Sequence, residues 1–230
     1  MSILVKKIGF FILMILVCVN FGFTKKKPKI FVIGDSISIH YGPYLNNYLK
    51  GNYIYDRKGG NVIAENLDNP AGANGGDSFM VLTYLNELKE NPEFTTDYLL
   101  INCGLHDIKR NYPTEDLHIH IENYIGNLEK IIQICKKLEA KLIWINTTPV
   151  VDSIHNTKIP FKRYNKDVIE YNLASKALMQ KMGVPIIDLY SFTFPYIPNA
   201  YIDHVHYSSD IREKQAKFIS EQIIKISKTY

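Results

Sequence analysis

Cysteine is scarce in this sequence, which limits the part that disulfide bonds or thiolate metal sites can play. The 230 residues include 3 cysteines, and Cys18 lies in an apolar N-terminal run. Cys103 sits at an expected strand, and Cys135 lies on the apolar face of an expected helix. We therefore expect two buried free thiols rather than a disulfide framework. The CxxC and HExxH patterns of zinc sites are also missing.

Neither sign of charge dominates the chain, and no segment has the composition of a linker. There are 27 Lys and Arg against 23 Asp and Glu, giving a net charge of +4. A nucleic acid or another polyanion is therefore not an expected partner. Because repeats, low-complexity tracts and Pro/Gly-rich stretches are also missing, we expect residues 25–230 to form a single domain with one sizeable core.

The sequence also lacks a run of about 20 apolar residues, the length that a membrane-spanning helix needs. A shorter apolar stretch at residues 8–19 follows Lys6 and Lys7 and precedes a polar, basic segment. This is the layout of a signal peptide over residues 1–24, with cleavage before Lys25. We expect export to the periplasm or secretion from a bacterial cell. An uncleaved N-terminal membrane anchor is the alternative.

Short runs rich in β-branched and aromatic residues alternate with amphipathic stretches, a pattern typical of a parallel sheet with helices on both faces. The expected strands are residues 30–33, 53–55, 98–102, 142–146 and 185–188. Pro185 suits only a strand start or a sheet edge. The expected helices are residues 78–89, 121–138, 166–182 and 209–228. The pattern predicts an α/β fold, a three-layer α/β/α sandwich with a mainly parallel sheet of about five strands.

The loops that follow the strands hold the reactive side chains, because open parallel sheets bind ligands at the carboxyl ends of their strands. Gly34-Asp35-Ser36 follows the first strand, and Ser36 either caps the next helix or acts as a nucleophile; no GxSxG surrounds it. Gly104-Leu105-His106-Asp107 follows the third strand. Near the C-terminus, the spacing of Asp203 and His206 lets the carboxylate hold the imidazole. Serine, aspartate and histidine on separate loops are the set that a catalytic triad needs.

In this order the motifs make the sequence resemble the SGNH (GDSL-type) hydrolases over essentially all of the expected domain. Gly34-Asp35-Ser36 is similar to the block that carries the family's nucleophile, and Asp203 with His206 is similar to its DxxH block. Asn74-Gly75-Gly76-Asp77-Ser78 resembles the block whose glycine donates a backbone N–H to the oxyanion. Gly104-Leu105-His106-Asp107 stands where the family has GxND, and resembles a bacterial subgroup that carries GLHD.

The resemblance implies a flavodoxin-like fold and ester hydrolysis by a Ser-His-Asp mechanism, with no metal and no cofactor. Ser36 would be the nucleophile, His206 the general base, and Asp203 the residue that orients His206. The backbone N–H groups of Ser36 and Gly76 and the side chain of His106 would stabilise the oxyanion. His106 replaces the family's asparagine, and a neutral imidazole still offers one N–H donor.

The expected substrate is a small-molecule or oligosaccharide ester, with acetyl as the leading acyl group. This expectation comes from residues 147–150 and 163–165, which resemble carbohydrate esterases of the rhamnogalacturonan acetylesterase type. Four side chains near the rim either hold a sugar or pack within the protein: Tyr207, Tyr164, Tyr112 and Arg110. Gly75 and Gly60 are weaker alternatives to Gly76 as the oxyanion donor.

Two other function classes stay open at the level of sequence. A metal-dependent hydrolase would use the pair His204 and His206 beside Asp203. A second HxH pair, His118 and His120, is expected at a solvated helix start. A non-catalytic carbohydrate-binding or envelope-interaction protein is also compatible with the fold, because one fold hosts many functions.

Three further acids are interpreted as hydrogen-bond acceptors at helix starts rather than as catalytic groups. They are Asp35, Asp77 and Asp107.

Overall fold

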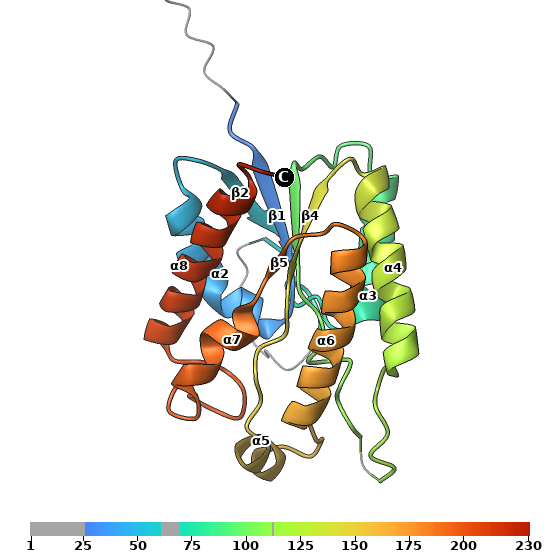
Figure 1. Ribbon diagram of the computed structural model, residues 1–230, viewed down its shortest axis with the longest axis vertical. Coiled ribbons are helices and arrows are strands. Elements are labelled where there is room, and N and C mark those ends of the chain that lie inside the picture. The colour runs from blue at the N-terminus through green and yellow to red at the C-terminus, as the bar shows by residue number, and fades with distance from the viewer. Residues whose placement is uncertain (1–25, 61–69, 112) are drawn as a thin grey trace, which may run out of the picture.

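The computed structural model describes residues 26–60, 70–111 and 113–230 (Figure 1). The expected signal peptide at residues 1–24 and the rim residue Tyr112 lie outside these ranges, so both predictions stay untested. Within the described ranges, no helix has both the length and the apolar character needed to cross a membrane.

Five parallel strands form one sheet in the order β2-β1-β3-β4-β5. Their bounds are β1 Lys29–Ile33, β2 Ile54–Arg57, β3 Tyr98–Ile101, β4 Lys141–Ile145 and β5 Ile186–Ile187. All four residues of β3 are buried, as expected for a central strand covered on both faces. The prediction of a parallel, five-stranded α/β sheet is confirmed. Pro185 precedes β5 at the edge of the sheet, where a missing backbone donor is tolerated.

Helices cover both faces of this sheet, which gives the three layers that the sequence predicts. The elements are α2 Ser36–Leu49, α3 Ser78–Glu90, α4 Ile121–Lys137, α5 Asp152–Lys158, α6 Asn165–Lys181, α7 Leu189–Thr193, the 3-10 turn η1 Phe194–Tyr196 and α8 Ser209–Ile226. Helix α2 packs against α8 on one face, while α3, α4 and α6 pack side by side on the other (Figure 1). The short helices α5 and α7 were not expected from the sequence.

Helix α4 has the clear apolar stripe that the sequence indicates. Its buried side chains include Tyr124, Leu128, Ile131, Ile132 and Cys135. Both Cys103 and Cys135 are buried free thiols, as predicted. The stripe therefore packs α4 against the sheet, where the helix contacts β4. The Tyr124 hydroxyl also donates to the Cys103 carbonyl at 3.2 Å, just before the turn at residues 104–107.

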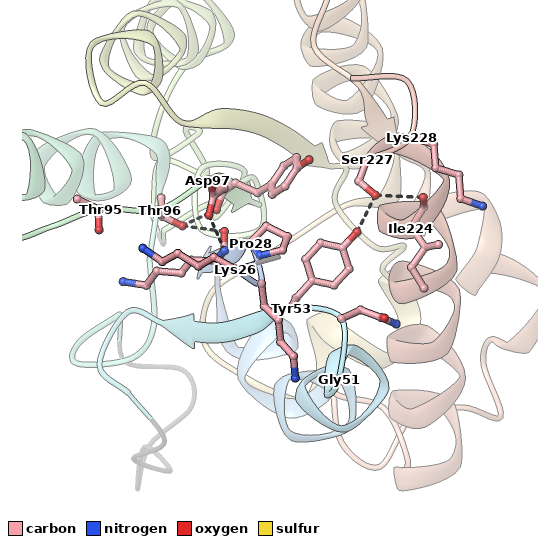
Figure 2. Close-up of a pocket in the computed structure, with 14 residues that line it drawn as sticks. Lys26, Pro28, Gly51, Tyr53, Thr95, Thr96, Asp97, Ile224, Ser227 and Lys228 are labelled. Carbon is pink, nitrogen blue, oxygen red and sulfur yellow. Dashed lines mark hydrogen bonds between the residues drawn. The ribbon is translucent and has the colours of Figure 1, made fainter. Parts of the chain in front are cut away.

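The carboxyl ends of the parallel strands all lie at one end of the sheet, and the C-terminus of the chain lies at the opposite end (Figure 1). At the edge away from the strands' carboxyl ends, a cavity of about 840 Å³ opens beside Lys26, Tyr53, Asp97 and Ser227 (Figure 2). Ser36, Asp203 and His206 do not line it. The candidate catalytic residues therefore lie away from this cavity, in the loops that follow the carboxyl ends of the strands.

Candidate active site

Ser36 occupies the first position of helix α2, immediately after the turn that ends β1. Asp35 is the N-cap residue, and its side chain accepts a hydrogen bond from the Ile37 N–H at 3.0 Å. The alternative that Ser36 caps the helix is therefore wrong, because its neighbour does so. Since Asp35 satisfies the N–H of Ile37, the Ser36 hydroxyl is available for another partner.

That partner is the imidazole of His206. His206 Nε2 lies 2.8 Å from Ser36 Oγ, and His206 Nδ1 lies 2.7 Å from Asp203 Oδ2. Both Ser36 and His206 are buried. The structure thus brings together three side chains from two distant segments of the chain. Ser36 and His206 are in contact although 170 residues separate them in the sequence. The line from hydroxyl to imidazole to carboxylate has the geometry that nucleophilic catalysis requires.

The loop at residues 203–206 is shaped by Asp203 itself. Its Oδ1 accepts the backbone N–H groups of Val205 and His206, each at 2.8 Å. Burial alone would raise the pKa of this carboxyl, but these two N–H groups and the imidazole of His206 outweigh it and hold the pKa well below its usual value. Asp203 is therefore ionised at neutral pH and can stabilise a positive charge on His206.

His40 is a neighbour of this relay that sequence reasoning left without a role. It lies four residues after Ser36 in α2, and its ring packs edge-on against His206 with centroids 4.9 Å apart. Burial, followed by the nearby charges of Arg212 and His206, lowers the pKa of His40 to about 4. His40 is therefore neutral at neutral pH and adds no positive charge beside the catalytic imidazole. The i, i+4 spacing from Ser36 was the one signal that could have found it.

The candidate oxyanion donors differ in the partners that their N–H groups already have. The Ser36 N–H is in the first turn of α2, where backbone donors have no partner within the helix. Gly76 has a φ of +72°, and its N–H donates to Asn74 Oδ1 at 2.9 Å. Gly75 donates its N–H to the Gly34 carbonyl at 2.8 Å, and Gly60 donates its own to Arg57. An oxyanion at Gly76 would have to share that N–H with Asn74 or displace it.

His106 lies buried in the turn that follows β3, and Asp107 fixes this turn to the start of α3. Both carboxylate oxygens of Asp107 lie within hydrogen-bond distance of the Ser78 N–H, at 2.9 and 3.1 Å. Burial raises the pKa of Asp107 to about 7. Asp77 caps α3 by accepting from the Met80 N–H at 2.9 Å. Together with the capping role of Asp35, these contacts confirm that all three acids serve as acceptors at helix starts.

A family model for GDSL-like lipase/acylhydrolase proteins matches residues 30–219. The chain belongs to this family. It is accordingly an ester hydrolase, as the sequence predicts. A search among curated proteins found no match.

Solved structures of GDSL-type and related esterases share the fold at low identity. A putative acylhydrolase from Bacteroides fragilis is 20% identical, with a TM-score of 0.65 over 88% of this chain and 89% of its own. An acetyl xylan esterase is 15% identical, with a TM-score of 0.62 over 85% of this chain and 99% of its own. Est24, a carbohydrate acetylesterase from Sinorhizobium meliloti, is 16% identical, with a TM-score of 0.58 over 87% and 100%. These likenesses show the fold of a GDSL-type hydrolase.

In this GDSL-family chain, residue 104 has to be glycine because the side chain of Thr147 approaches its backbone closely. Gly104 has a φ of +149°, and a Cβ atom there would lie 2.2 Å from Thr147 Oγ1. Thr147 Oγ1 in turn donates to the Cys103 carbonyl at 3.2 Å. The turn that carries His106 is therefore pressed against the loop after β4, and any larger residue would push the two apart.

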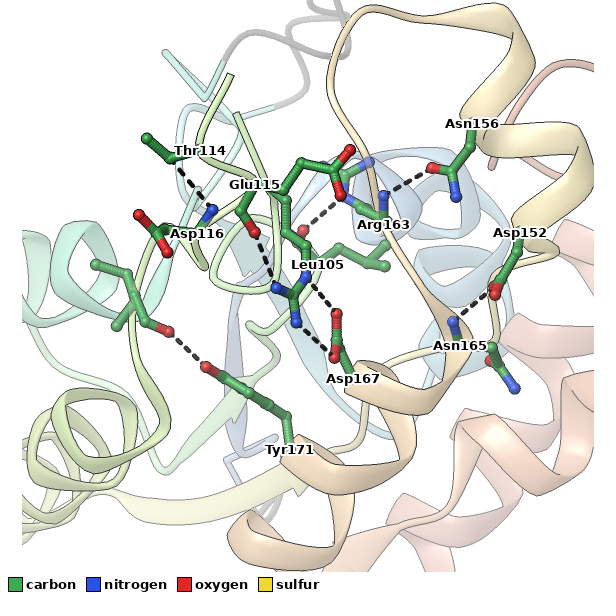
Figure 3. Close-up of polar contacts among 12 residues, drawn as sticks. Leu105, Thr114, Glu115, Asp116, Asp152, Asn156, Arg163, Asn165, Asp167 and Tyr171 are labelled. Atoms are coloured by element: carbon green, nitrogen blue, oxygen red, sulfur yellow. Dashed lines mark hydrogen bonds and ion pairs between the residues drawn. The ribbon is translucent and has the colours of Figure 1, made fainter. Parts of the chain in front are cut away.

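The rim residues proposed for sugar binding mostly serve the fold. Tyr207 is fully buried, and its hydroxyl lies 3.3 Å from the Pro149 carbonyl. Arg110 forms a two-pronged ion pair with Asp167, at 2.9 and 3.0 Å (Figure 3). Tyr164 immediately precedes α6, and the guanidinium carbon of Arg110 lies 5.8 Å from the centroid of the Tyr164 ring. For Tyr207 and Arg110, packing within the protein is therefore the reading that holds.

The donor set for a metal overlaps with the relay. Asp203, His204 and His206 offer ligand atoms within 4.8 Å of one another. Both ring nitrogens of His206 already contact Ser36 and Asp203, so a cation bound there would break one of these contacts. The two histidines of the second HxH pair have different surroundings. His118 contacts Asp77 at 3.1 Å, whereas His120 is exposed at the start of α4. The contacts fit a proton relay better than a cation site.

Proposed function

We propose that this ester hydrolase is a serine esterase that removes small acyl groups, chiefly acetyl, from carbohydrate. The observation that carries the proposal is the continuous contact from Ser36 Oγ to His206 Nε2 at 2.8 Å and from His206 Nδ1 to Asp203 at 2.7 Å. A binding surface has no use for this alignment. The relay therefore favours hydrolysis over the alternative of a non-catalytic carbohydrate-binding or envelope-interaction protein.

The proposed reaction has two halves. Ser36 Oγ attacks the ester carbonyl while its proton moves to His206 Nε2, and Asp203 stabilises the imidazolium. The C–O bond to the alcohol then breaks, and His206 returns the proton to the departing alkoxide. Water attacks the acyl-enzyme in the same way, which releases the acid and restores Ser36.

The oxyanion of each tetrahedral intermediate is assigned to the N–H groups of Ser36 and Gly76 and to the imidazole of His106. Placement at the N-terminus of α2 supports the first donor, because the helix dipole favours negative charge there. The left-handed turn at Gly76 supports the second. Asn74 then acts as the resting acceptor for the Gly76 N–H, and it yields when the oxyanion forms.

Carbohydrate as the alcohol is supported by the acetyl xylan esterase and the carbohydrate acetylesterase that share the fold. Export is the second part of the proposal: residues 1–24 act as a signal peptide, which places the enzyme among envelope or extracellular polysaccharides.

Acetate release from acetylated oligosaccharides tests the function directly. The purified full chain should release acetate, and Ser36→Ala should abolish release. Ser153→Ala is a matched control, because Ser153 is an exposed serine on α5. If Ser36→Ala released acetate as fast as the control, Ser36 would not be the nucleophile. If only esters other than acetate were cleaved, the acyl group would be wrong while the mechanism stood.

A further inference from the structure

A pair of buried histidines lies behind the loop that carries the proposed base. We propose that His155 of helix α5 is a positioning residue that holds the loop at residues 203–206 through His204. This inference rests on the proposed serine esterase function. It adds one residue that no sequence motif of the family identified.

The contact joins two segments that are far apart in the sequence. His155 Nδ1 and His204 Nδ1 lie 3.1 Å apart, across 49 residues. The rings meet edge to face, with centroids 4.9 Å apart and an angle of 68° between their planes. His155 is 0% exposed and His204 is 6% exposed, so water cannot readily replace either partner.

The facing nitrogens require the two rings to differ at Nδ1. Two Nδ1 atoms form a hydrogen bond when one carries the proton and the other offers a lone pair. One ring is therefore the Nδ1–H form, and the other keeps its Nδ1 unprotonated. Because the bond is directional and shielded from solvent, it sets the rotation of the His204 ring and with it the path of the backbone on either side.

The loop depends on such support, because it is short and carries two of the three relay residues, Asp203 and His206. His204 lies between Asp203 and His206, and its ring is 5.8 Å from that of His206. A second contact from the same helix reaches the loop, since Lys158 Nζ lies 3.4 Å from the Asp203 carbonyl. A shift of the loop by about 1 Å would lengthen the contact between His206 and Ser36 and is enough to lower turnover roughly 100-fold.

Helix α5 is held firmly enough to act as this support. Asp152 accepts the Asn165 N–H at 2.7 Å, and Asn156 accepts the Arg163 N–H at 2.9 Å (Figure 3). The Arg163 side chain in turn donates from Nε to the Leu105 carbonyl at 2.6 Å. Through α5, the loop that carries the base is therefore braced against the turn that carries His106.

Two amide substitutions at residue 155 separate positioning from general polarity. Asparagine carries its amide on Cγ and so places a donor or acceptor where histidine has Nδ1, whereas glutamine extends past that point. We expect His155→Asn to keep kcat within about threefold of the parent. We expect His155→Gln and His155→Leu to lower kcat about 10-fold to 100-fold while KM changes little. His120→Leu, at an exposed histidine, is the control and should behave like the parent.

The measurements are kcat and KM for a chromogenic acetate, with the melting temperature of each full-length variant and the labelling rate of Ser36 by a fluorophosphonate. The inference is overturned if His155→Gln and His155→Leu match His155→Asn in kcat and labelling rate. If His155→Leu does not fold, the same comparison with His204→Asn, His204→Gln and His204→Leu decides the matter. Failure of the proposed function would look different, because Ser36→Ala would then stay active in the unchanged background.

Discussion

Replacing Asp203 by asparagine should disable the enzyme without unfolding its loop. Asp203 accepts on both oxygens: Oδ2 faces His206 Nδ1 at 2.7 Å, while Oδ1 takes the backbone N–H groups of Val205 and His206 at 2.8 Å each. An amide has one acceptor and one donor side. Because the two backbone N–H groups can only donate, the amide oxygen of Asp203→Asn should face them and keep the turn.

The amide NH₂ group must then face His206 Nδ1, which has to accept. That moves the proton of the neutral imidazole to Nε2, where His206 cannot take the proton of Ser36. Restoring the working tautomer would set the buried Nδ1–H of His206 against the amide NH₂ group. The side chain at residue 203 is 40% exposed, so the main cost is the one buried donor left unsatisfied, about 1–3 kcal/mol. At about 1.4 kcal/mol per tenfold change in rate, kcat should fall by about 5-fold to 140-fold.

The assay is turnover of 4-nitrophenyl acetate, followed together with thermal unfolding. Asp203→Asn should keep the melting temperature close to that of the parent, whereas Asp203→Ala should lower it because the turn loses its acceptor. Asp116→Asn, at an exposed aspartate, provides the control for removal of one charge. Turnover of Asp203→Asn within about threefold of the parent would refute the orienting role of Asp203.

Three further predictions concern the turn at residues 104–107. Gly104→Ala should lower the free energy of unfolding in urea by about 2–6 kcal/mol, because its Cβ atom would lie 2.2 Å from Thr147 Oγ1. The loss should be smaller in a Thr147→Ala background. An equal loss in both backgrounds would contradict a steric clash with Thr147 as the cause. The folded state holds a proton on Asp107 between pH 3.8 and about 7 that the unfolded chain releases, so stability should fall as pH rises through this window. Asp107→Asn should flatten that slope by at most about 1.4 kcal/mol per pH unit, and an unchanged slope would exclude this carboxyl as its source. His106→Asn should keep most of the turnover, whereas His106→Ala should lose about 100-fold to 1,000-fold; equal losses would show that His106 does more than donate a hydrogen bond.

The main elements of the fold were predictable because their signals are long or strongly apolar. Helix α4 shows several turns of a buried stripe, and β3 is a run of four buried residues. Helices α5 and α7 span 7 and 5 residues, which is too short for a helical period to stand out. In α5 the one buried residue is His155, which a pattern of apolar residues cannot detect.

The candidate site was predictable where a motif follows a strand, and not where packing alone makes the contact. Ser36 and the turn at residues 104–107 come directly after β1 and β3, which are neighbours in the sheet. Asp35 and Ser36 are both good capping residues, so the sequence left open which of them begins α2; the extended backbone of Asp35 decides it. His40 and His155 reach the loop at residues 203–206 from helices, and no local spacing links either one to His206.

Covalent labelling by a fluorophosphonate, mapped by mass spectrometry, shows whether Ser36 is the nucleophile that His206 activates. We expect one adduct on the folded enzyme, on Ser36 Oγ, formed at least about 100-fold faster in the parent than in His206→Ala. Folded enzyme with no adduct, or with its adduct on another serine, would contradict the claim that Ser36, His206 and Asp203 act together.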